Sequence, residues 1–351
     1  MARPAPARAY YTRELLRQRT LGLCEFVGPE AAQALRRMAE DEVVEEIGLS
    51  ARTDCLMPAF LIQMVGYVSS TLPDDPMAMV LETMHTADGY RAFHDFCAEH
   101  SQCLRRLLSE QRIQSHHIER CGPLFPALCL VARMLEAQEV SFVDIGAAGG
   151  LHLFWDHYRY RFEPLGTFGA LDSDIEVAWQ WHGRQPRDPE SFLRAPRVGA
   201  RTGIDLAPID ISTQEGRRWL AAFGGSESRV LDAVLALGRR HAHRMLEGDC
   251  LELLPSLLGT TPPHMTSVVM HSFTTIQFSE AMNDALEAIF VEASRRRPLG
   301  RAWLEGSLDS AEPVEVRIAT YTGGDVVQQT VARGALPIDI RDWFEWLGPV
   351  E

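Results

Sequence analysis

The sequence contains no lysine, since all 34 of its basic residues are arginine. A chain without a lysine amine cannot form a Schiff base, anchor pyridoxal phosphate or supply the lysine of a phosphate-binding P-loop. Paired cysteines are missing as well. The seven cysteines form no C-x-x-C pair, so we expect buried, reduced thiols rather than a disulfide framework or a zinc site.

Long apolar runs and an excess of positive charge are also absent. No stretch is apolar enough to span a bilayer and no export signal is visible, so we expect a cytoplasmic protein with no membrane association. The net charge of −14 opposes the phosphate neutralisation on which nucleic-acid binding depends. The basic triplet at residues 295–297 falls where a helix should end, and we expect it to complement the helix dipole. The expected partner is therefore a small-molecule substrate.

The hydrophobic pattern changes near residue 139. Apolar residues recur at helical spacing from residue 8 to about 138, whereas short apolar runs alternate with helical stretches from Val140 onward. This pattern predicts a helical region, residues 1–138, followed by an α/β domain with a mostly parallel sheet, residues 139–351. A long insertion, about residues 163–197, contains Trp179 and Trp181 in an alternating segment that predicts an extra strand. The other candidate strands are residues 141–145, 199–205, 244–247, 267–271 and 301–305, followed by a hairpin of residues 314–321 and 326–331.

A glycine-bearing turn follows the first predicted strand. Asp144 ends the apolar run, and Gly146, Gly149 and Gly150 lead into a helix expected over residues 151–160. Glycines let a ligand approach the backbone closely, and the start of a helix offers free N–H groups. The segment lacks the G-x-G-x-x-G of dinucleotide-binding proteins. Its D-x-G-x-x-x-G is similar to the turn of S-adenosylmethionine (SAM)-dependent methyltransferases, where an acid and glycines receive the amino-acid end of SAM; the alternative is a tight strand–helix junction.

Acidic residues also follow the next two predicted strands. Asp205 resembles the methyltransferase acid that accepts hydrogen bonds from both ribose hydroxyls. Asp249 resembles the residue that contacts the adenine amino group, and Cys250 would pack beside it. An ionised carboxylate suits these tasks because it only accepts hydrogen bonds. Each acid alone is equally consistent with a cap or a turn, but three acids at successive strand ends favour a cofactor site for SAM.

Residues 143–162 resemble an uncharacterised bacterial family, domain of unknown function 2332, which typically reads V-E-V-G-A-S-A-G-L-N-L in this turn. Residues 203–210, His271-Ser272, Gln277 and the tryptophan-bearing residues 343–346 are similar to it too, so the resemblance covers nearly the whole chain. It implies a Rossmann-like class I methyltransferase fold with a mostly parallel seven-stranded sheet, but no established reaction. The chain departs from the family at His152, where the family has asparagine, and at residues 114–117. If these positions contact substrate, substrate choice or activity has changed.

The candidate catalytic base is His271, at the end of the fourth predicted strand. In this fold class that strand end faces the transferred methyl group, and imidazole has a pKa near working pH. The alternative is a histidine at the edge of the core with a backbone partner. For Tyr158 the sequence favours packing against the insertion, and lining or closing a pocket is the alternative. The candidate residues for contact with substrate are His117, His152, Tyr158, Ser272 and Gln277.

No metal site is predicted. The histidine pairs at residues 116–117 and at residues 241 and 243 have no companion acid at a suggestive spacing. The sequence thus predicts a SAM-dependent methyltransferase for a small-molecule acceptor, with the helical region as a lid, a substrate pocket or a homodimer surface. The alternative is a SAM-binding protein without catalysis that acts in regulation or assembly. A nucleotide-dependent oxidoreductase is disfavoured by the missing G-x-G-x-x-G.

Overall fold

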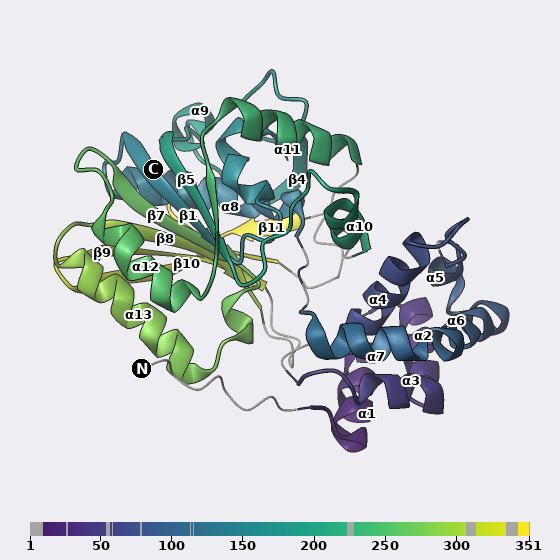
Figure 1. Cartoon of the computed structure of the whole chain (residues 1–351). Coiled ribbons are helices and arrows are strands. Elements are labelled where there is room, and N and C mark those ends of the chain that lie inside the picture. Colours follow the sequence, from purple (N-terminus) through teal and green to yellow (C-terminus); the bar gives the residue numbers. More distant parts are fainter. Residues whose placement is uncertain are drawn as a thin grey trace. The chain divides into compact units, whose positions relative to one another are not determined.

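The computed structural model describes residues 10–25, 27–53, 57, 59–77, 79–112, 114, 116–222, 228–306, 314–334 and 343–350. The chain divides into two compact units (Figure 1). The first comprises Met1–Gln114 and Arg218–Phe223, and the second comprises Ser115–Arg217 and Gly224–Glu351. Across the described ranges, no helix combines the length and the apolarity that a membrane crossing requires.

The first unit is built from helices, as its sequence pattern predicts. Side chains at their ends accept hydrogen bonds from backbone N–H groups of the first turn: Thr12 before α1, Asp41 before α3 and Thr86 before α6. Phe60, Met64, Phe93 and Leu104 are fully buried among these helices. Their bounds are α1 Arg13–Gly22, η1 Leu23–Glu25, α2 Pro29–Met38, α3 Glu42–Gly48, α4 Ala59–Ser70, α5 Val80–Thr83, α6 Ala87–Glu99 and α7 Ser101–Glu110.

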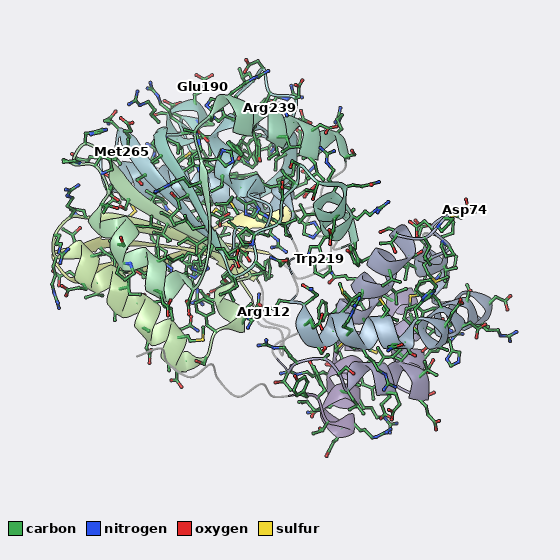
Figure 2. The ribbon with its side chains drawn as sticks, in the orientation of Figure 1. Asp74, Arg112, Glu190, Trp219, Arg239 and Met265 are labelled. Atoms are coloured by element: carbon green, nitrogen blue, oxygen red, sulfur yellow. The ribbon has the colours of Figure 1, made fainter. Side chains whose placement is uncertain are left out.

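Helix α10 (Gln214–Ala222) returns to the first unit at its end. The indole N–H of Trp219, labelled in Figure 2, donates to the side-chain oxygen of Gln114 at 3.1 Å. Its ring meets that of Tyr67 edge-on, with the centroids 4.9 Å apart. A return from far along the sequence therefore completes the first unit, which the helical pattern of residues 8–138 does not predict.

The second unit is an α/β structure around a large, mostly parallel sheet of 11 strands (Figure 1). The strand order is β3-β2-β4-β11-β10-β9-β8-β7-β1-β5-β6. The strands from β8 to β6 in this order pair in parallel, whereas β9 pairs antiparallel with both neighbours. The bounds are β1 Glu139–Ile145, β2 Arg159–Glu163, β3 Gly166–Gly169, β4 Glu176–Gly183, β5 Arg197–Asp205, β6 Arg244–Glu247, β7 Thr266–Ser272, β8 Leu299–Glu305, β9 Val314–Thr322, β10 Asp325–Gly334 and β11 Trp343–Trp346.

The α/β class and the predicted strands are confirmed, but the expected number of seven strands is wrong. The predicted insertion is part of the sheet, because β3 and β4 lie in it and join β2 and β11 at one side. The helix expected over residues 151–160 is also wrong at its end, since a 3-10 helix, η3 (Leu151–His157), precedes β2. Tyr158, Tyr160 and Phe162 are fully buried at alternate positions, which is the period of a strand rather than of a helix.

Helices cover both faces of the sheet at β8. Gly300 lies against α8 (Cys121–Met134), since an added Cβ would come within 2.2 Å of Cγ1 of Val131. The guanidinium carbon of the next residue, Arg301, lies 5.1 Å from the ring centroid of Phe290 in α13 (Glu280–Ser294). Successive side chains of a strand point to opposite faces, so α8 and α13 enclose β8. The remaining helices are η2 Ile118–Arg120, α9 Pro189–Phe192, α11 Ser228–Arg240, α12 Cys250–Gly259 and η4 Thr275–Gln277.

Replacing Gly300 by alanine should destabilise the second unit, because the added methyl group would overlap Val131 of α8. Such overpacking typically lowers the free energy of unfolding by about 1–3 kcal/mol. Gly259→Ala is the matched control, since the nearest atom to an added Cβ there is 3.9 Å away. Urea unfolding followed by circular dichroism measures both, and equal stabilities would contradict the close packing of α8 on β8.

Candidate functional site

The glycine turn leaves the sheet where the strand order reverses. β1 pairs with β5 on one side and with β7 on the other, and in α/β sheets ligands bind outside the carboxyl ends of strands at such a point. Gly146 and Gly150 have φ angles of +76° and +73°, a conformation that glycine adopts without strain. An added Cβ at Gly146 would also lie 2.3 Å from Oγ1 of Thr274. The first and last glycines are therefore required by the fold of the turn itself.

The backbone N–H groups of the turn already have acceptors. Those of Gly146 and Ala147 donate to the carbonyl oxygen of Ile204 at 2.8 and 3.1 Å, and that of Gly150 donates to Ala147. The N–H of Gly149 makes the longest of these contacts, 3.3 Å to Nδ1 of His116. A ligand that reaches this turn therefore competes with hydrogen bonds within the protein.

Asp205 and Asp249 both make local hydrogen bonds at their strand ends. The two carboxylate oxygens of Asp205 accept from the N–H groups of Ala148 and Ala207, each at 2.9 Å. Asp249 caps α12 by accepting from the N–H of Leu251 at 2.8 Å. A carboxylate has about four acceptor positions, so an acid that caps a helix or closes a turn can also receive a ligand. Burial raises the pKa of the Cys250 thiol to about 12, which keeps it protonated beside Asp249.

Asp144 is the most unusual group at this end of the sheet. Its side chain is 1% exposed, and its Oδ2 atom accepts no hydrogen bond from any of the residues described. Burial raises its pKa well above the ordinary value, and the charge of Asp205 raises it further, although Arg120 acts in the opposite direction. A buried oxygen without a partner costs free energy, so Asp144 is poised to bind a donor or a cation.

Two histidines lie beside Asp144. Nδ1 of His152 is 3.7 Å from Oδ2 of Asp144, and its Nε2–H donates to the carbonyl oxygen of His117 at 2.9 Å. The ring of His116 meets that of His152 edge-on, with centroids 4.1 Å apart. Burial lowers the pKa of His152 to about 3 and that of His116 well below its ordinary value. Both rings are therefore neutral, and the sequence did not predict that His116 would lie here.

His271, the predicted base, is held by charged neighbours on both sides. Its Nδ1–H donates to Oε1 of Glu305 at 2.7 Å, and its Nε2 accepts from Nε and Nη2 of Arg301 at 3.0 and 2.8 Å. Burial, and then the charge of Arg301, lower its pKa to about 4. Its partners are thus side chains rather than the backbone, and its lone pair is occupied. A role as base stays a prediction that requires this contact to open.

His271 and Asp144 point to opposite faces of the sheet. His271 pairs in register with Ile145, and Ile145 packs in one cluster with Phe290 of α13. Asp144 precedes Ile145 and therefore faces the other side. The structure brings Asp144 together with His152 and the carbonyl of His117, but it does not bring the predicted base to the same face.

Glu305 is the residue that sequence reasoning missed. Its Oε1 also accepts from the N–H groups of Thr274 and Thr275 at 2.9 and 3.0 Å, and its Oε2 accepts from Ile276 at 3.3 Å. The hydroxyl of Thr274 donates in turn to the carbonyl oxygen of Ile145 at 3.0 Å. Glu305 thus fixes the loop after β7 against the end of β1. Glu305 ends the fifth predicted strand, as acids end or follow the first three. This position is the sequence feature that could have identified it.

The other predicted substrate contacts are dispersed. Tyr158 is fully buried and its hydroxyl donates to the carbonyl oxygen of Leu151, so it packs within the core. Ser272 is buried, and its hydroxyl has no partner within the described part of the chain. Gln277 is exposed and donates to the carbonyl oxygen of Phe273 at 3.1 Å. Of these three, only Ser272 has a buried side-chain polar atom without a partner among the described residues.

Comparison with protein families gives a match over nearly the whole chain. The family described as "Uncharacterized protein conserved in bacteria (DUF2332)" matches residues 14–346. No match is found among curated proteins. The matched range includes the glycine turn, the three acids, the histidines beside Asp144, and Glu305.

Replacing Glu305 by glutamine should lower the free energy of unfolding by about 1.5–3 kcal/mol, the usual contribution of a hydrogen bond to a charged group. The amide keeps one acceptor oxygen, but its NH₂ group cannot accept hydrogen bonds from the N–H groups of the loop. Glu292→Gln is the control, because that side chain is 61% exposed in a surface pair with Arg295. Urea unfolding measures both variants, and an effect no larger than that of the control would show that Glu305 does not anchor the loop.

The stability of the protein should fall as the pH decreases from about 6.5 to about 4, partly because of His271. Its pKa is about 4 in the folded state and 6.5 is its ordinary value, so between these values the unfolded chain binds a proton that the folded chain does not. This one group should cost about 2 kcal/mol between pH 7 and pH 5. In His271→Gln, urea unfolding at the two pH values should show a smaller loss than in the control His264→Gln, an exposed histidine. An unchanged loss would contradict the assignment.

Proposed function

The chain belongs to the bacterial family of uncharacterised proteins DUF2332, and we propose that it is a SAM-dependent methyltransferase for a small-molecule acceptor. SAM would bind at the carboxyl ends of β1, β5 and β6. SAM supplies an activated methyl group, and the protein holds it beside an acceptor and excludes water. A cytoplasmic location and the use of the first unit as a lid, a substrate pocket or a dimer surface are parts of the same proposal.

The observation that carries the proposal is the register of the three strand ends. Asp144 pairs with Gly203, two residues before Asp205, and Asp205 pairs with Glu247, two residues before Asp249. The acids therefore lie at the carboxyl ends of three adjacent parallel strands, each two residues further along than the one before. This placement suits a ligand that extends across the sheet with a different polar group at each strand end.

The residues present fit the parts of SAM. Asp144, with its partnerless Oδ2, and the turn with Gly146, Gly149 and Gly150 would hold the amino-acid end. Asp205 would accept from the ribose hydroxyls, and Asp249 from the adenine amino group with Cys250 beside it. SAM carries an ammonium and a sulfonium, so its approach would favour the ionised form of Asp144.

The alternative function, SAM binding without catalysis, is favoured by the state of His271. Its lone pair faces the guanidinium of Arg301, and its side chain lies on the other face from Asp144. A methyltransferase with this arrangement would depend on positioning and desolvation rather than on proton removal by His271. Ser272, His117 and His152 remain candidate acceptor contacts, whereas Tyr158 and Gln277 would act through the conformation of the turn and the loop.

Titration calorimetry with SAM and S-adenosylhomocysteine tests the cofactor, with NADH as the comparison ligand. We expect micromolar binding of both adenosyl ligands, no binding in Asp144→Ala, and about 10–100-fold weaker binding in Asp205→Asn, because a hydrogen bond to a charged group is lost. Asp232→Asn is the control, since that carboxylate is 65% exposed in a pair with Arg217. Failure of the wild-type protein to bind either adenosyl ligand would refute the proposal.

Transfer of a labelled methyl group separates the two functions once binding is established. The protein is incubated with methyl-labelled SAM and a bacterial small-metabolite extract, and the label is followed by chromatography. Transfer that is lost in Asp205→Asn and kept in Asp232→Asn is expected of a methyltransferase. Binding without transfer to any fraction would favour the alternative.

A further inference from the structure

A cluster of His116, Asp144 and His152 has the composition of a metal site. Each residue offers one ligand atom, and the three atoms lie within 4.8 Å of one another. Their side chains are 1%, 1% and 2% exposed. Two polar atoms of the cluster, Nε2 of His116 and Oδ2 of Asp144, have no hydrogen-bond partner among the residues placed in the structure. Buried polar atoms without partners are rare, and a bound water, ion or ligand is the usual explanation.

His152 already has the orientation of a metal ligand. Its Nε2–H donates to the carbonyl oxygen of His117, which leaves the lone pair on Nδ1 directed towards Asp144. Such a hydrogen bond from the second ring nitrogen is the usual support of a metal-bound histidine. The separation of 3.7 Å between Nδ1 and Oδ2 of Asp144 is too long for a hydrogen bond. It is close to the roughly 3.4 Å between two ligands about 2.1 Å from a tetrahedral metal.

His116 can supply the third ligand with a small change. Its Nδ1 atom accepts a long hydrogen bond of 3.3 Å from the N–H of Gly149, so its proton lies on Nε2, the atom without a partner. Coordination through Nε2 requires the proton to move to Nδ1 and the ring to shift away from Gly149. This proton transfer and ring shift would replace the hydrogen bond from Gly149 with a coordination bond. The N–H of Gly149 would then be free to donate elsewhere.

The charges around the cluster favour a divalent cation. Burial lowers the pKa of Arg120 to about 10 against the opposing charges of Glu305, Glu119 and Asp144, and the charge of Asp205 acts on Asp144. These five groups are four carboxyl groups and one guanidinium. A divalent cation at Oδ2 would favour the ionised form of Asp144, so the excess of carboxyl groups supports a cation here despite Arg120.

We infer that His116, Asp144 and His152 bind one divalent first-row transition-metal ion, of the class for which zinc is a representative. Two imidazoles and one carboxylate suit such an ion, and three protein ligands leave a further coordination position open. The ion would join the segment before η2 and helix η3 to the end of β1. The inference uses the same Oδ2 atom of Asp144 as the proposed SAM site, so the two ligands would compete there, but it does not depend on SAM binding.

Equilibrium dialysis of the full chain against zinc, after removal of metals with a chelator, tests the inference. We expect one zinc per chain, and at least about 100-fold weaker binding in His116→Gln and in His152→Gln, because each removes a ligand. His264→Gln, an exposed histidine outside the cluster, should bind as the wild type does. Absence of zinc binding to the wild type, as expected if the cluster holds only water, would overturn the inference, and so would equal binding by all three variants.

Thermal unfolding with zinc, and binding of zinc and SAM by Asp205→Asn, test the metal site separately from the SAM site. Zinc should raise the thermal unfolding temperature of the wild type and of His264→Gln but not of His116→Gln, whose apo form loses one long hydrogen bond and the ring contact with His152. A rise of equal size in His116→Gln would count against the site. Asp205→Asn should weaken SAM binding and keep zinc binding, so failure of the SAM proposal and failure of the metal site are distinguishable.

Discussion

The burial of one carboxyl group at the end of β1 is the constraint on which the candidate site depends. Asp144 occupies the strand position that faces α8, so its carboxyl group is buried and has almost no contact with solvent. Two neutral histidines lie beside it. The charge of Asp205 raises its pKa, and the guanidinium of Arg120 lowers it. An apolar residue at this buried position would cost less free energy than a carboxyl group with a partnerless oxygen. The acid therefore makes chemical sense chiefly as a ligand for something positively charged.

A second carboxylate organises the opposite side of the strand ends. Glu305 receives N–H groups from three successive residues of the loop after β7 and also holds His271. The same carboxylate thus determines the course of the loop and the orientation of the ring. In a methyltransferase, this arrangement would make the loop rigid before an acceptor arrives, at the expense of a free imidazole base. Rigid placement of an acceptor is itself a large contribution to rate.

The sequence predicted which residues form the strands of the second unit. It did not predict which side chains lie next to one another in the folded structure. Apolar runs such as residues 141–145 and 267–271 mark strands because both faces of these strands are buried. The alternation of Tyr158, Tyr160 and Phe162 was overlooked because it directly follows a glycine turn after which a helix was expected. The face of His271 depends on its pairing with Ile145, and the position of His116 depends on the path of the chain before α8. Neither follows from local pattern, since both are set by tertiary packing.

The ends of the large sheet have a consequence for how the protein behaves in a crowded solution. The outermost strands, β3 and β6, are each only four residues long. An exposed sheet edge is a template on which another chain can add a strand, and short edge strands offer few unpaired N–H and C=O groups for this purpose. The unit can therefore maintain a wide sheet with little tendency to join its copies edge to edge.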